Sequence, residues 1–143
     1  MATVDVLGNV ELFEELDKED LERLAKVTVT RDYKAGDVIV REGELGVAFY
    51  IVATGKVEVV KGLDTAAETV VATMGPGQFF GEMALFDNQM RSASVRAVED
   101  TECLVLTKWD FNAELKETDG RIALTMLSLL ARRIRAMTDA ASH

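Results

Sequence analysis

Short apolar runs that alternate with polar residues and are broken by glycine fill the middle of the chain, from Val27 to Thr107. Alternation with a period of two residues is typical of strands. The runs predict strands at residues 38–40, 49–52, 57–60, 69–74, 92–98 and 102–107, with turns at residues 35–37, 42–43, 54–55, 61–64 and 75–77. Because no stretch between these runs is long enough to hold a crossover helix, we expect an antiparallel barrel or jelly roll.

The pattern becomes helical on both sides of this region. Asp17 is placed to cap a helix over residues 18–26, whose apolar side consists of Leu21, Leu24 and Ala25. On the C-terminal side, residues 109–115 predict a short helix, and residues 118–120 open a longer one. The predicted fold class is therefore mainly β with flanking helices (α+β): an antiparallel β-roll or jelly roll with N-terminal helices and a C-terminal helical lid.

The longer helix runs to about Thr138 and carries a broad apolar stripe. Its apolar residues recur every four positions, with further small or apolar residues alongside: Ile122, Met126, Leu130 and Ile134, with Ala123, Leu127 and Ala131. Two interpretations of this stripe remain open. Either the helix packs wholly on the core, or part of it faces a second subunit or moves over a ligand.

Length and composition predict a single globular domain over residues 1–143, with a helical prelude at 9–26, a β-roll at 27–107 and C-terminal helices at 108–138. Hydrophobic residues make up 48% of the chain and charged residues 29%, which excludes disorder. No apolar run approaches the ~18 residues of a membrane span, and no secretory signal is expected. Cys103 is the single cysteine, so no internal disulfide forms and a reducing cytoplasm is expected.

The charge and the histidine count restrict the function further. A net charge of −9 disfavours nucleic acid and an anionic membrane surface as partners. It does not disfavour a small anion, because the nearest groups set the field in a pocket. The only histidine is His143, so we expect neither a histidine-dependent catalytic triad nor a histidine metal site, and no enzyme activity.

The candidate chemistry lies between Pro76 and Ala97. This segment places Gly81 and Glu82 at the start of a short helical turn, and Arg91 just before a strand. Amides at a helix N-terminus together with a guanidinium bind phosphate well. A carboxylate in the same place repels phosphate, so Glu82 must serve another group, for which a sugar hydroxyl is the natural candidate. The segment therefore predicts a site for a phosphorylated sugar.

Residues 76–97 resemble the phosphate-binding cassette of the cyclic nucleotide-binding domain family, of the catabolite activator protein and kinase A regulatory subunit type. The likeness covers residues 12–138, nearly the whole chain. It follows the family's glycine punctuation and strand pattern at residues 35–39, 42–46, 49–52 and 55–59. The resemblance implies a stand-alone domain that binds cAMP or cGMP as a ligand and uses no other cofactor and no metal.

The resemblance also assigns the polar half of the site. Arg91 is expected to hold the cyclic phosphate, and a planar guanidinium suits two equatorial oxygens better than lysine does. Ser92 and Ala93 would let backbone amides approach the same phosphate. Glu82 would accept from the ribose 2′-hydroxyl beside the thin wall at Gly81, while Met83 and Ala84 would present amides. The plainer alternatives are an Arg91 paired with Asp87 or Glu82, and a Glu82 that only stabilises its own helix.

For the purine, the resemblance implies apolar walls and a cap. Val59, Val71 and Met74 match the base-contacting wall of the family, although each could equally be simple core. A residue of the last helix often caps the base in this family. Arg132, Arg135 and Thr138 are the candidates here, and the sequence does not choose among them.

The sequence departs from the family in two places. Met90 stands where the kinase-type members have proline before the cassette arginine. The sequence ends at His143, where the transcription activators continue into a helix-turn-helix domain, so DNA binding is not carried over. The initial methionine and compact ends favour a small whole protein over a fragment of a channel, kinase or regulator.

Two functions of different classes follow. The first is a regulatory sensor that binds a cyclic nucleotide, cAMP favoured over cGMP, and repositions its last helix toward an effector protein or a second copy. The second is a protein-interaction or dimerisation module whose pocket is empty or repurposed. The presence of both Glu82 and Arg91 favours the first function, because a scaffold needs neither residue.

Overall fold

The structure, a computed structural model, describes residues 3–141, with no side-chain description for Met83 and Ala141. The helices are α1 (Thr3–Gly8), α2 (Lys18–Val27), α3 (Lys108–Glu117) and α4 (Arg121–Ala141), with short 3₁₀ helices η1 (Glu11–Phe13) and η2 (Glu82–Leu85). The strands are β1 (Val29–Tyr33), β2 (Val38–Val40), β3 (Ala48–Thr54), β4 (Val57–Lys61), β5 (Thr69–Met74), β6 (Phe79–Phe80), β7 (Ser94–Ala97) and β8 (Thr101–Thr107).

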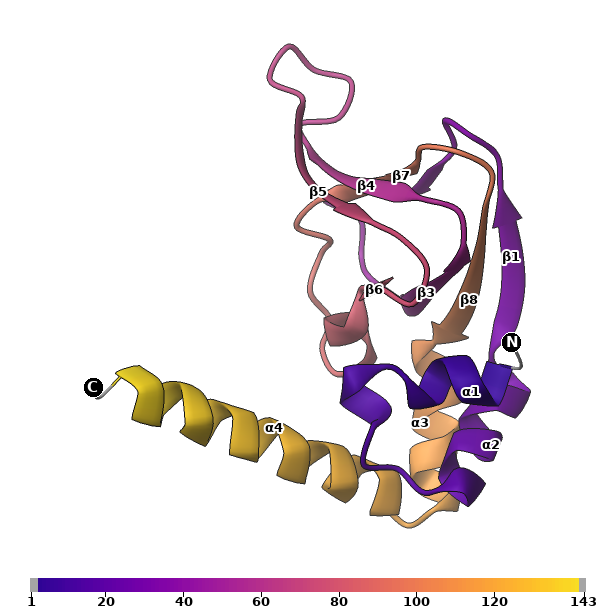
Figure 1. The fold of residues 1–143 in the computed structure, drawn as a ribbon, viewed down its shortest axis with the longest axis vertical. Helices are drawn as coiled ribbons and strands as arrows, with labels where there is room; N and C mark the ends of the chain where they lie inside the picture. The colour runs from indigo at the N-terminus through magenta and orange to yellow at the C-terminus, as the bar shows by residue number, and fades with distance from the viewer. Residues whose placement is uncertain (1–2, 142–143) are drawn as a thin grey trace.

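The strands form two four-stranded sheets, in the orders β1-β8-β3-β6 and β2-β7-β4-β5. All strand pairs within residues 3–141 are antiparallel. Figure 1 shows the sheets wrapped into a roll, with the helices gathered at one end of it. This architecture confirms the predicted fold class of an antiparallel β-roll with flanking helices.

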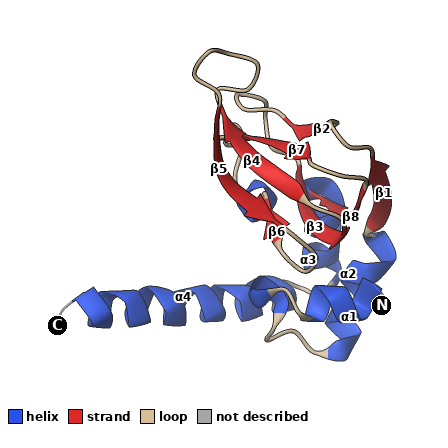
Figure 2. Ribbon diagram, turned by 45° about the horizontal axis from the view of Figure 1, so that its top comes forward, coloured by secondary structure: helices blue, strands red, loops and turns tan. Residues whose placement is uncertain are grey.

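The two faces of β3 join the two parts of the core. Phe49 and Ile51 are almost fully buried against the helices, in a cluster that also contains Phe13, Leu24, Phe111 and Ile122. On the opposite face, Tyr50 and Val52 pack inside the roll. This alternation follows from the period of two residues in a strand. Figure 2 shows helices α1, α2 and α3 close to the sheet that contains β3 and β8.

Most of the predicted elements are present. Asp17 caps α2 by accepting from the Asp20 amide at 2.9 Å, and Thr107 caps α3 in the same way. The predicted strands at 38–40 and 69–74 have the observed bounds, whereas the run at 92–98 is a strand only over Ser94–Ala97. Strands β1 and β6 and helix α1 were not predicted.

Helix α4 leaves the body of the protein. Its first half packs through Ile122, Met126 and Leu129, which are at most 5% exposed. Asp20, 2% exposed, binds Arg121 through both carboxylate oxygens, at 2.5 and 3.1 Å, and so fixes the start of the helix. The second half extends away from the roll in Figures 1 and 2, and Ile134 on it is 64% exposed. No helix in the described part of the chain is long and apolar enough to span a membrane.

Candidate functional site

A cavity of about 360 Å³ opens between the inner face of β4 and β7 and the segment that follows β6. Its volume falls within the ~300–1,000 Å³ of small-molecule sites. It is lined by residues 79–82, 84, 87 and 89–93, together with Val40, Gly46, Val59, Met74 and Val95. The cavity therefore has an apolar wall of strand residues and a polar wall of predicted cassette residues.

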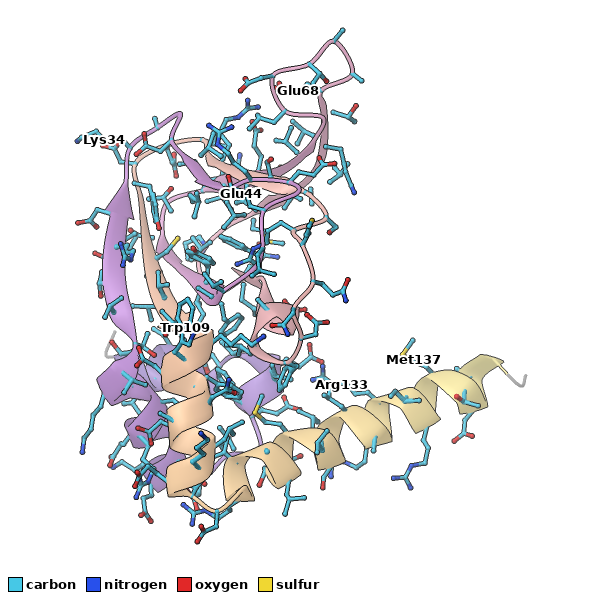
Figure 3. All side chains as sticks on the ribbon, turned by 180° about the vertical axis from the view of Figure 1, so that it is seen from behind. Lys34, Glu44, Glu68, Trp109, Arg133 and Met137 are labelled. Carbon is cyan, nitrogen blue, oxygen red and sulfur yellow. The ribbon has the colours of Figure 1, made fainter. Side chains whose placement is uncertain are left out.

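The backbone of Arg91 is fixed by the segment that precedes β3. The Arg91 amide donates to the Glu44 carbonyl at 2.7 Å, and the Arg91 carbonyl accepts from the Gly43 amide at 2.9 Å. One residue pair further, the Gly46 amide donates to the carbonyl of Gln89 at 3.2 Å. These antiparallel bonds set where the arginine side chain starts, and the labelled Glu44 in Figure 3 marks the segment on the roll.

The guanidinium of Arg91 lies in a tight seat. Its Nη2 donates to the Ala48 carbonyl at 2.7 Å, and its Cζ lies 5.8 Å from the centroid of the Tyr50 ring. Two glycines make the room: a β-carbon at Gly81 would lie 2.3 Å from Nη1, and one at Gly46 would lie 3.1 Å from Nε. The guanidinium is thus contacted by a carbonyl and by an aromatic ring, and no carboxylate of the described residues is hydrogen-bonded to it.

Burial lowers the pKa of Arg91, and the charges of Tyr50 and Glu82 act in the opposite direction. An arginine nevertheless stays protonated at physiological pH. Among the described residues, Arg91 forms no ion pair with a carboxylate. The alternative in which Arg91 pairs with Asp87 or Glu82 is therefore not seen here, although the charge of Glu82 is close enough to raise the pKa of Arg91. A half-buried cation without an ion-paired carboxylate favours an anionic ligand.

The helical turn of the cassette is η2, which begins at Glu82. Glu82 and Gly81 line the cavity and are half-buried. Gly81 has a φ of +80°, a conformation that glycine adopts without strain. The Ala84 amide donates to the Gly81 carbonyl at 3.0 Å, so in this structure it closes the turn. Ala84 itself lines the cavity, and the side chain of Met83 lies outside the described residues.

Most of the remaining predicted contacts lie at the same cavity. Ser92 and Ala93 line it beside Arg91, and Lys61 donates from Nζ to the Ser92 carbonyl. Val59 and Met74 line the apolar wall. Val71 does not: the pairing of β4 with β5 shifts between Val59 and Val60, which leaves Val71 as an extra residue of the bulge, 54% exposed.

The three candidate base caps lie on the extended half of α4. None of the described residues that line the cavity comes from this helix. Arg132 forms an ion pair with Glu15 at 2.6 Å, and the Thr138 hydroxyl donates to the Ile134 carbonyl at 2.9 Å. Arg135 is exposed. Figure 3 places the labelled Met137 on this same stretch, away from the roll, whereas Arg133 one turn earlier still pairs with Glu11 at 2.6 Å.

Several residues of the site were not predicted. Val95 faces the cavity because it pairs with Val59 across β4 and β7, and its alternation with Ala93 and Ala97 was the available signal. Gly46 stood in the glycine pattern without an assigned role. Tyr50 carries no local signal at all, since its contact with Arg91 joins residues that are 41 positions apart.

Among the described residues, no cluster of His, Cys, Asp or Glu is arranged to hold a metal ion.

Comparisons with known proteins place the chain in a family. The cyclic nucleotide-binding domain family matches residues 30–118. The chain is 40% identical over 124 residues to the "Cyclic AMP receptor protein" of Thermus thermophilus, covering 87% of this chain and 57% of that protein. It is 35% identical over 118 residues to a cGMP-dependent protein kinase of Drosophila melanogaster, covering 80% of this chain and 13% of the kinase.

A solved structure agrees over almost the whole length of the chain. The N-terminal domain of a transcriptional regulator from Streptomyces coelicolor A3(2) superposes with a TM-score of 0.85 and 31% identity, covering 96% of this chain and 95% of that domain. The chain therefore belongs to the cyclic nucleotide-binding domain family, whose members are regulatory binding domains. It spans a little over half of the Thermus relative and about an eighth of the kinase.

Proposed function

We propose that this domain is a regulatory sensor that binds a cyclic nucleotide, cAMP in preference to cGMP, without catalysing a reaction. The observation that carries the proposal is that Arg91 and Glu82 line one cavity of about 360 Å³. Arg91 would bind the cyclic phosphate, and Glu82 would accept from the ribose 2′-hydroxyl. Val59, Val95 and Met74 would contact the base. The single thiol, Cys103, is buried and unpaired, which suits the reducing cytoplasm that the proposal includes.

The preference for cAMP rests on two points. The relative with the higher identity is the one named for cyclic AMP. In addition, the side chains proposed to contact the base, Val59, Val95 and Met74, are apolar and offer no strong acceptor for the N1–H and N2–H₂ donors of a guanine. The Ser92 hydroxyl beside Arg91 would reach an exocyclic group of either purine and does not decide between them. Adenine has only its N6 amino group as a donor and no N1–H, so it loses less when it is buried against this wall.

We further propose that ligand binding repositions α4 through α3. The Phe86 ring, just after η2, contacts the ring of Phe111 on α3 edge to face at 5.7 Å. Lys108 at the start of α3 donates to the Asp87 carbonyl at 2.7 Å. A movement of η2 toward a ligand would therefore press on α3, and the turn at Asp119 and Gly120 would absorb the change.

The output surface is the exposed side of α4, and a second copy of the chain is the partner that it fits. Leu124, Leu127, Ala131 and Ile134 are spaced three, four and three residues apart, which is the seam spacing of a coiled coil. The three large residues of this seam are 57–65% exposed. Pairing two such helices would bury apolar side chains that a monomer leaves in water.

Thermal unfolding with added nucleotides tests the proposal. At 100 times its dissociation constant, a ligand adds about 2.7 kcal/mol to the free energy of unfolding. We expect cAMP to raise Tm, cGMP to raise it less at equal concentration, and non-cyclic AMP to leave it nearly unchanged. If none of the three compounds changes the Tm of the free protein, an interaction module with an empty or repurposed pocket is favoured instead. Hydrogen exchange over residues 121–141 should change on cAMP binding, and unchanged exchange would contradict the repositioning of α4.

A further inference from the structure

Tyr50 lies directly behind the site and does not line the cavity. Its ring points into the roll from β3, and it stacks on the ring of Phe80 with centroids 4.9 Å apart and planes 5° from parallel. Phe80 does line the cavity. Tyr50 is thus in the second layer of the wall, clamped by the layer that a ligand would touch.

The same strand holds Arg91 at two points. The Ala48 carbonyl accepts from Nη2, and the Tyr50 ring lies 5.8 Å from Cζ, inside the ~6 Å range of cation–π attraction. Phe80 fixes the plane of the ring, and strand pairing fixes Tyr50 opposite Val105. The guanidinium is therefore held by groups that ring stacking and strand pairing keep in place.

The chemical nature of these two groups, a carbonyl and an aromatic ring, determines whether the charge of Arg91 stays available to a ligand. A carboxylate would also order the guanidinium, but it would neutralise the charge and compete with a phosphate for the same edge. A ring face and a carbonyl order the side chain while the full positive charge stays available. The rotamer freedom of a long arginine side chain is then lost before a ligand arrives.

We propose that Tyr50 is the positioning residue of this site, which holds the Arg91 guanidinium in the orientation that receives an anionic phosphate ester. The contribution to nucleotide affinity rests on the proposed function, whereas the contact between ring and guanidinium does not. Tyr50 acts through Arg91, so its aromatic ring is required and its hydroxyl is not.

Three single variants at the two tyrosines test this proposal, together with Arg91→Lys as a reference. Tyr50→Phe keeps the ring, Tyr50→Leu removes it, and Tyr33→Leu is the matched control. Tyr33 is the other tyrosine of the roll and packs in the same cluster as Tyr50, around Ala48, Cys103 and Val105. Circular dichroism and Tm establish that each variant is folded before any binding is measured.

The first readout needs no ligand. In the free protein, the Nε–H resonance of Arg91, assigned by its loss in Arg91→Lys, should be shifted upfield by the ring current of Tyr50. The shift should persist in Tyr50→Phe and in Tyr33→Leu and disappear in Tyr50→Leu. An unshifted resonance in the wild-type protein overturns the proposal, even if Tyr50→Leu fails to fold.

The second readout is the titration of each variant with cAMP. We expect roughly tenfold weaker binding for Tyr50→Leu and near wild-type binding for Tyr50→Phe and Tyr33→Leu. In an Arg91→Lys background, Tyr50→Leu should add little further loss. Equal losses in both backgrounds, or in Tyr33→Leu as well, would mean that the ring is only structural and would overturn the proposal. If wild-type protein fails to bind cAMP, the proposed function falls, and the resonance alone decides the role of Tyr50.

Discussion

Gly46 lies against the side chain of Arg91, so closely that a β-carbon on it would be 3.1 Å from Nε and 3.2 Å from Cζ. The same β-carbon would lie 3.1 Å from Cβ of Ala84 on η2. Gly46 is not held at a positive φ, so its backbone tolerates other residues. The reason for a glycine at this position is therefore space for the guanidinium.

Gly46→Ala should consequently weaken cAMP binding about tenfold, because it displaces Arg91. It should also lower Tm, because the new β-carbon presses on the buried Ala84. Gly75→Ala is the matched control, since a β-carbon at Gly75 has nothing within 4 Å. Calorimetric titration and thermal unfolding of both variants separate the two effects. Wild-type affinity in Gly46→Ala would show that the guanidinium has more freedom than its seat indicates.

Glu82 offers a test that is specific for one atom of the ligand. If its carboxylate accepts from the ribose 2′-hydroxyl, Glu82→Gln should cost about 1 kcal/mol of cAMP binding, the difference between a hydrogen bond to a charged acceptor and one to a neutral acceptor. The same variant should bind 2′-deoxy-cAMP as well as the wild-type protein does. Asp87→Asn, which changes another acid that lines the cavity, is the control. Equal losses for both nucleotides in Glu82→Gln would remove the ribose role.

Alkaline pH should destabilise the roll through Cys103 and Tyr33. Burial, and then the charge of Glu102, raises the pKa of Cys103 from 9.0 to about 11. Burial, with Tyr50 and Cys103, raises the pKa of Tyr33 from 10.0 to about 12. Because the folded state favours the protonated forms, stability should be constant below about pH 9 and fall as pH rises toward 11 and 12.

Thermal unfolding between pH 8 and pH 11 measures this slope. Cys103→Ala should unfold at a lower temperature at pH 8, because it loses buried volume, yet show a flatter decline above pH 9. A decline as steep as that of the wild-type protein would place the titrating groups elsewhere.

We expect the protein to self-associate through α4. Leu127→Glu puts a charge at the centre of the exposed seam and should shift a dimer toward monomer in analytical ultracentrifugation. Ala136→Glu adds the same charge to an exposed position off the seam and should leave the dimer intact. A wild-type protein that stays monomeric at all accessible concentrations would exclude the second copy as the partner.

Local pattern was sufficient to predict the roll and the polar wall of the site. Alternation predicted strands such as β5, and the Asp17 cap predicted α2. Each of these signals depends only on residues that are close together in the sequence. The cassette was predictable for the same reason: Gly81, Glu82 and Arg91 occur within one short segment.

The features that the sequence did not reveal depend on long-range packing. Strand β1 is exposed over most of its length. Its sequence therefore lacks the apolar alternation that is typical of a half-buried strand. Val71 matched a base-contacting position, but a bulge that depends on pairing with β4 leaves it outside the cavity lining. The apolar spacing of α4 gave its helical state but not its direction, which involves long-range contacts such as the ion pairs of Arg121 with Asp20 and of Arg132 with Glu15.

The central claim is that Arg91 binds the phosphate of a cyclic nucleotide. Calorimetric titration of the wild-type protein, Arg91→Ala and Arg96→Ala with cAMP and cGMP tests it most directly. Arg96 is the matched control, because it lies on β7 and pairs with Glu58 and Glu68. We predict saturable binding to the wild-type protein and to Arg96→Ala, tighter for cAMP, and a loss of about 2–5 kcal/mol in Arg91→Ala. Wild-type affinity in Arg91→Ala, or no binding of either nucleotide to the wild-type protein, would contradict the account.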